Sequence, residues 1–105
     1  RDDQTGCLVD EGNAAGEITK ATRRCWPQTE IAKAWMAQAE SGEAGAADEA
    51  RRALARLHRY YLNHPVAGGW YDQFDASGRS MVDFIPASSF YHVLCAVAEA
   101  ERVLA

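Results

Sequence analysis

GCLVDEGNAAGEITKATRRCWPQTE (residues 6–30) aligns without a gap on GGWYDQFDASGRSMVDFIPASSFYH (residues 68–92) at an offset of 62. At this offset two glycines align with glycines, one aspartate aligns with an aspartate, and Glu30 aligns with His92. A repeat of this length is typical of stacked units that cannot bury their apolar faces alone. The alignment therefore predicts two neighbouring units that carry, at equivalent positions, polar side chains able to take part in catalysis or binding.

Each unit begins with a predicted hairpin. The first runs from Cys7 to Cys25 around the turn 13–16, and the second from Trp70 to Phe84 around the turn 75–78. Asn or Asp opens each turn and glycine closes it, which is typical of hairpin loops that end in a left-handed residue.

Helical spacing follows each hairpin and predicts helices at about 28–40, 46–63 and 88–104. Pro27 and Pro86 lie just before the first and third helices, where a missing N–H costs little. On the first helix we expect one side to carry Ile31, Ala34, Trp35 and Gln38, with Trp35 in the core. On the second we expect a stripe of Ala50, Leu54, Leu57 and Tyr61.

The third predicted helix is apolar nearly all round from Phe90 to Ala98, which predicts burial between layers. We interpret 1–105 as a single partial domain of about one and a half units, with a first repeat at 6–67 and an incomplete second repeat at 68–105. Because so few elements bury little surface, we expect either the end of a larger protein or a chain that self-associates.

Composition narrows the function classes. The net charge is −4 and no basic run occurs, which argues against nucleic acid or a membrane as a partner. Three cysteines, odd in number and without a C-x-x-C pair, favour reduced, mostly buried thiols in a cytoplasmic protein. His58 and His64 have no metal-ligand spacing and are expected on the surface or in packing contacts.

The motif W-x-Q-x-E at residues 26–30, the segment 68–75 and the F-Y-H that ends segment 86–92 carry a family resemblance. They resemble the C-terminal end of the N-acylglucosamine 2-epimerase superfamily, nearest to its mannose-6-phosphate isomerase-like branch. The resemblance covers nearly the whole chain.

The resemblance implies an all-α fold, the C-terminal portion of an (α/α)6 barrel with a sugar site at one mouth. Six units of this period would make roughly 370 residues, of which this chain is about the last quarter. The implied chemistry is isomerisation or epimerisation of a reducing sugar or sugar phosphate through an enediolate, without metal or cofactor. Two histidines usually share the proton transfers, and His92 corresponds to the C-terminal one. The other would lie outside this chain, so we expect the fragment alone to be inactive.

The candidate site residues follow from these matches. We expect His92 to be the catalytic acid/base. Arg23 and Arg24 are the candidates for binding a phosphate, since guanidinium pairs with phosphate bidentately. The candidates for substrate contact are Glu30, Trp26, Gln28, Trp70, Gln73 and Ser88.

Every candidate also has a purely structural interpretation. Histidine and tryptophan side chains commonly pack in the core, a carboxylate near a helix start is stabilised by the helix dipole, and serine and glutamine cap helices. Arg23 and Arg24 could also form a solvated pair. Asp72 and Gln73 could either reach the cavity or serve turn and strand bonding.

Two other functions remain open at this point. The chain could be a stand-alone helical-repeat module that assembles with itself or with a partner and has no activity. It could also belong to a carbohydrate hydrolase, which would need two carboxylates across the scissile bond, and Asp10, Asp72 and Glu30 are available.

Overall fold

A computed structural model describes residues 1–105 throughout. The helices are α1 (Cys25–Glu40), α2 (Ala46–Leu57) and α3 (Phe90–Leu104). The strands are β1 (Glu11–Gly12), β2 (Ile18–Lys20), β3 (Arg23–Arg24) and β4 (Gln73–Phe74). A π-helical turn (His58–Leu62) continues α2, and a 3-10 turn (Ala87–Ser89) leads into α3.

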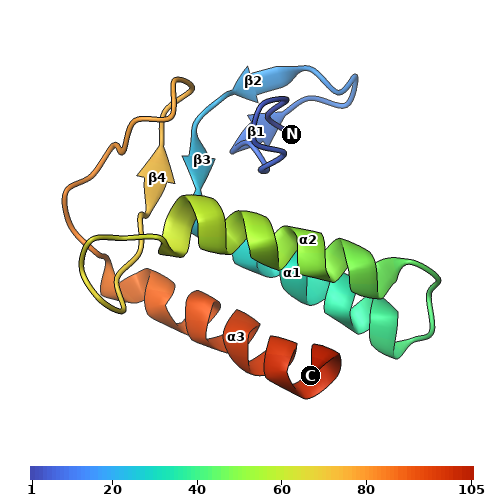
Figure 1. The fold of residues 1–105 in the computed structure, drawn as a ribbon. Coiled ribbons are helices and arrows are strands. Elements are labelled where there is room, and N and C mark those ends of the chain that lie inside the picture. Colours follow the sequence, from blue (N-terminus) through green and yellow to red (C-terminus); the bar gives the residue numbers. More distant parts are fainter.

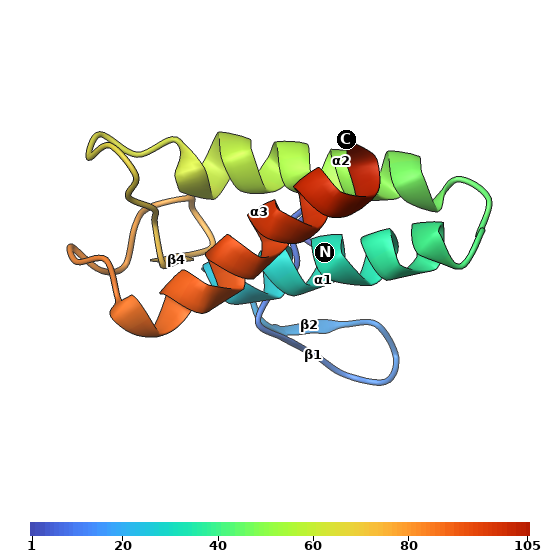
Figure 2. The ribbon, with the colours of Figure 1, turned by 90° about the horizontal axis from the view of Figure 1, so that it is seen from below.

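The three helices form the body of the molecule (Figure 1). α1 and α2 lie side by side, and α3 lies against them on the side away from the β1–β2 hairpin. Figure 2 shows α3 running diagonally from the start of α1 toward α2. α1 and α3 therefore begin at the same end of the molecule. None of the helices is long and apolar enough to cross a membrane.

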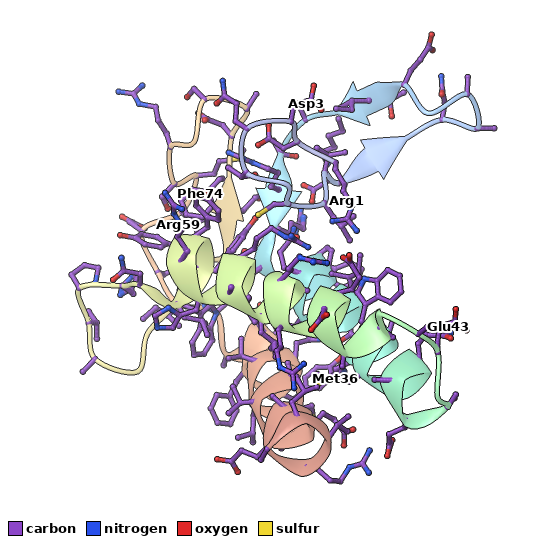
Figure 3. The ribbon with its side chains drawn as sticks, turned by 45° about the vertical axis from the view of Figure 1, so that its right-hand side comes forward. Arg1, Asp3, Met36, Glu43, Arg59 and Phe74 are labelled. Atoms are coloured by element: carbon purple, nitrogen blue, oxygen red, sulfur yellow. The ribbon has the colours of Figure 1, made fainter.

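Two buried clusters hold the helices together. The cluster between α1 and α2 consists of Ala32, Met36, Ala50 and Ala53. Its small side chains let the two helices approach closely, and Met36, labelled in Figure 3, fills the remaining space. The second cluster lies near the strands and consists of Cys7, Cys25, Leu57, Tyr61 and Trp70.

Both predicted turns are confirmed, and they are built alike. Asn13 Oδ1 accepts backbone N–H groups from the two residues 15 and 17, and Asp75 Oδ1 accepts from residues 77 and 79. Gly16 and Gly78 close the turns at φ +85° and +88°, where a side chain would be strained.

The second hairpin differs from its prediction. β4 pairs antiparallel with β3 of the first repeat, Arg23 opposite Phe74 and Arg24 opposite Gln73. Within its own hairpin it makes only the bridge from Phe74 to Ser80. β1 and β2 pair with each other within the first hairpin, whereas β3 and β4 join the two segments that align in the sequence.

The predicted helix ranges hold to within a few residues, but one predicted face is wrong. The buried face of α1 includes Ala32 and Met36, whereas Ala34 and Gln38 are exposed. Alanines surround this helix, so spacing alone does not single out its packing face. Trp35, expected in the core, is partly buried against the Ala32–Met36 cluster. In α2 the expected stripe is confirmed except that Leu54 is only partly buried.

The predicted burial of α3 between layers is not found in this chain. Its buried side bears Ala96, but Phe90, Leu94 and Val97 are 53%, 52% and 44% exposed. With Trp70 and Val93 they line an apolar groove of about 280 Å³. One side of α3 is thus covered by α1 and α2, and the other is open.

Candidate functional site

The site forms where α1 and α3 lie together near their first residues. Glu30 lies in the second turn of α1 and His92 in the first turn of α3, and Oε1 of Glu30 is 2.7 Å from Nδ1 of His92. Lys33, one turn further along α1, places Nζ 2.8 Å from the same oxygen. The offset found in the sequence thus becomes a direct contact between the two repeats.

The negative charge on Glu30 determines which ring nitrogen of His92 carries the proton. Partial burial acts to raise the Glu30 pKa, but hydrogen bonds from Lys33 and His92 outweigh it, so the pKa is lowered. An ionised carboxylate can only accept hydrogen bonds, so Nδ1 of His92 carries the proton. In the neutral ring this leaves the lone pair on Nε2, which can accept a proton from a substrate.

An open hollow of about 420 Å³ lies beside this pair. Its lining includes His92, which is 19% exposed at the side chain, and Trp26, which is 45% exposed. The ring centroids of Trp26 and His92 are 5.8 Å apart, and that of Tyr91 is 4.0 Å from His92. The remaining lining residues are Arg24, Asp72, Pro86, Ser88 and Ser89.

The structure therefore brings five of the sequence candidates together around one hollow, namely Arg24, Trp26, Asp72, Ser88 and His92. Glu30 lies behind His92 and contacts it directly. An imidazole, an exposed indole, a hydroxyl and a guanidinium are suited to a small polar ligand with C–H faces, such as a sugar.

The other candidates are engaged in the framework. The Gln28 side chain is buried and bonds both backbone groups of Leu8 and the carbonyl of Arg24. Gln73 donates to Asp10, whose carboxylate also accepts from Thr22. These contacts tie the N-terminal segment to α1 and to β4.

Trp70 lies apart from the His92 hollow. It is 7% exposed, belongs to the cluster with Leu57 and Tyr61, and faces Phe90 at 6.2 Å. The sequence makes Trp70, at the start of the second predicted hairpin, a candidate for substrate contact, but packing against the start of α3 places it in the core.

The two neighbouring arginines have different roles. Arg23 is buried and bonds Asp2, Thr5 and the carbonyl of Asp75. Arg24 is 45% exposed at the side chain, with Nε 3.7 Å from Asp10. Alternation along β3 explains the difference, because successive side chains point to opposite faces.

Sequence reasoning gave no weight to Lys33 and Tyr91 at this site. Lys33 follows Glu30 by one helical turn, a spacing at which side chains meet, and Tyr91 adjoins His92 in the chain. These two spacings are the sequence features that could have identified Lys33 and Tyr91 as residues of the site. No group of three His, Cys, Asp or Glu side chains lies close enough together to hold a metal ion.

The fold and the site define a class of protein: helical proteins with a carboxylate–imidazole pair where two neighbouring helices begin. The family model described as N-acylglucosamine 2-epimerase (GlcNAc 2-epimerase) matches residues 1–96. The chain belongs to this family, and the family resemblance seen in its motifs is confirmed.

Among curated proteins, the chain is similar to a protein named mannose-6-phosphate isomerase from Rhizobium meliloti (strain 1021). The two are 42% identical over 91 residues, which cover 83% of this chain and 23% of the relative. The chain thus spans about a quarter of that relative's length. No solved structure gives a significant match.

Proposed function

We propose that this chain forms the C-terminal part of an (α/α)6 barrel in a cytoplasmic sugar isomerase or epimerase. Its substrate would be mannose-6-phosphate or a related aldose. The observation that carries the proposal is the 2.7 Å contact between Glu30 and His92 beside an open hollow. Family membership and the mannose-6-phosphate isomerase relative support the choice of reaction and substrate class.

In the proposed reaction, His92 is the base. Nε2 takes the proton from C2 of the open-chain aldose, and the C–H electron pair becomes the C1–C2 double bond of an enediolate. The carbonyl oxygen takes a proton from an acid outside this chain. Return of a proton to C1, with loss of the proton on O2, gives the ketose. Return of a proton to the other face of C2, with loss of the proton on O1, gives the epimeric aldose.

Glu30 assists by holding Nδ1–H and by stabilising the imidazolium that forms, as a carboxylate does for other catalytic histidines. Trp26 stacks on the C–H face of the sugar, Ser88 contacts a hydroxyl, and Arg24 pairs with a phosphate. Gln28, Gln73 and Trp70 support these residues from the framework and are not assigned substrate contacts.

The first experiment is the intact mass of the native polypeptide in its source cells. A chain of roughly 40 kDa, as expected for about six such repeats, supports the barrel proposal. A native chain of 11.5 kDa contradicts a complete site in one subunit.

The second experiment uses that native protein with mannose-6-phosphate or mannose in D2O. We expect His92→Ala to abolish deuterium incorporation at C2, and His58→Ala, at an exposed position on the outer helix, to leave it unchanged. Exchange that persists in His92→Ala overturns the assignment of His92 as the base.

A second candidate function is assembly without catalysis. The exposed apolar side of α3 supports it, because Phe90, Leu94 and Val97 lie together on one face. A stable monomer in light scattering that binds no hydrophobic dye would argue against it.

A further inference from the structure

We propose that Asp72 is a positioning residue, which ties the start of α1 to the start of α3 and so sets the contact between Glu30 and His92. The geometric part of this inference is independent of the proposed reaction. Only its consequence for catalysis rests on the isomerase proposal.

Asp72 contacts the start of both helices, one through its backbone carbonyl and the other through its side chain. Its backbone carbonyl accepts the N–H of Cys25, the first residue of α1, at 2.7 Å. Its carboxylate Oδ1 accepts the hydroxyl of Ser89, directly before α3, at 3.0 Å. Glu30 and His92 then follow within two turns of these anchor points, so a shift at either anchor changes their separation.

Burial strengthens both contacts. Cys25 is fully buried and Ser89 is 6% exposed. A hydrogen bond shielded from water is electrostatically stronger than one on the surface, and leaving its donor unpaired is costly. An anionic side chain near the starts of two helices is also favoured by both helix dipoles. No side chain caps α1 or α3, and Asp72 is the polar link between their first residues, next to the Glu30–His92 contact itself.

A second tie holds the far end of the same two helices. Arg102 of α3 makes two hydrogen bonds of 2.7 Å to the carboxylate of Glu40 on α1. That pair is about half exposed, whereas the bond between Asp72 and Ser89 is partly buried. Glu30 and His92 lie between the two ties and closer to Asp72, so we expect Asp72 to control their distance.

The role requires an oxygen acceptor at residue 72 rather than a negative charge. Asp72→Asn keeps an Oδ1 that can accept from Ser89, whereas Asp72→Ala removes it. Ser89→Ala removes the donor of the same bond. Asp83→Ala is the matched control, because Asp83 is exposed in the segment between β4 and α3 and its side chain makes no hydrogen bond.

The test measures the protonated nitrogen of His92 in this 105-residue chain by 15N NMR of the imidazole ring. Thermal unfolding of each variant verifies that it folds. Glu30→Ala provides the reference for a ring that has lost its partner. We expect the wild type, Asp72→Asn and Asp83→Ala to keep the Nδ1–H form, and Asp72→Ala and Ser89→Ala to shift toward the Glu30→Ala spectrum.

Two results would overturn the proposal. One is a folded Asp72→Ala variant whose His92 spectrum equals that of the wild type. The other is an Asp72→Asn variant as altered as Asp72→Ala, which would show that the charge itself acts. Neither readout needs isomerase activity, so failure here and failure of the proposed reaction are distinguishable.

Discussion

Glu30 and His92 lie 62 residues apart in the sequence and are in contact, with 2.7 Å between Oε1 and Nδ1. Glu40 and Arg102 are also 62 residues apart and form a two-bond contact of their own. Corresponding positions on α1 and α3 therefore face each other along the helices. The offset of 62 residues found in the sequence is therefore also the offset between facing residues of α1 and α3.

The Glu30 contacts predict an acid-sensitive contribution to stability. Its folded-state pKa lies below the ordinary value of 4.5, so the contribution is present above pH 4.5 and is lost as the pH falls through the lowered pKa. Because the side chain is 39% exposed, screening limits the contribution to about 0.2–1 kcal/mol.

Urea unfolding of the wild type and Glu30→Gln at pH 6 and pH 3 measures this effect. We expect the wild type to be the more stable at pH 6 and the difference to shrink at pH 3. Glu43→Gln, in the exposed α1–α2 turn, is the control and should show no difference at either pH. A difference in unfolding free energy between the wild type and Glu30→Gln that is the same at pH 6 and pH 3 contradicts the prediction.

Thiol labelling should separate the three cysteines. Cys95 is exposed, whereas Cys7 and Cys25 are buried. Burial raises the pKa of Cys7, and burial followed by the charge of Asp72 raises that of Cys25 to about 12. A thiol with a raised pKa holds little thiolate, the reactive form.

With a thiol reagent at pH 8, we expect one cysteine to react quickly and the other two only after denaturant is added. Cys95→Ser should abolish the fast phase. Fast labelling of a second thiol in the folded chain would show that one of the two buried sites is open.

Leu57 should contribute strongly to stability. It is 1% exposed in the cluster with Cys7, Cys25, Tyr61 and Trp70. Leu57→Ala should lower the free energy of unfolding by about 2–5 kcal/mol, through lost burial and the cavity that remains. Ile18→Ala, at an isoleucine 49% exposed in β2, is the control and should change it by about 0.5 kcal/mol or less. Similar losses in both variants, measured by urea unfolding, would contradict the assignment of the core.

Self-association of this chain should depend on the open face of α3. Paired substitutions Leu94→Glu and Val97→Glu place charges within that apolar face, so hydrophobic dye binding and concentration-dependent association should both fall. Ala55→Glu on the exposed side of α2 adds charge elsewhere and is the control. Unchanged association in the α3 variant would place the contact on another surface.

The sequence by itself determined the repeat, the two turns and the three helices. These depend on local chemistry: glycine at left-handed turn positions, Asn13 or Asp75 accepting nearby N–H groups, and apolar spacing in α2. It also marked Glu30 and His92 as equivalent, and the family resemblance rested on motifs that contain both.

Only the tertiary structure decided what these elements pack against. It paired β3 with β4, buried Trp70, turned the Gln28 amide toward Leu8 and selected the Ala32–Met36 side of α1. Each of these outcomes depends on partners far away in the chain. Alanines around α1 and polar side chains near its start are compatible with several packings, and long-range burial and hydrogen bonding select one of them.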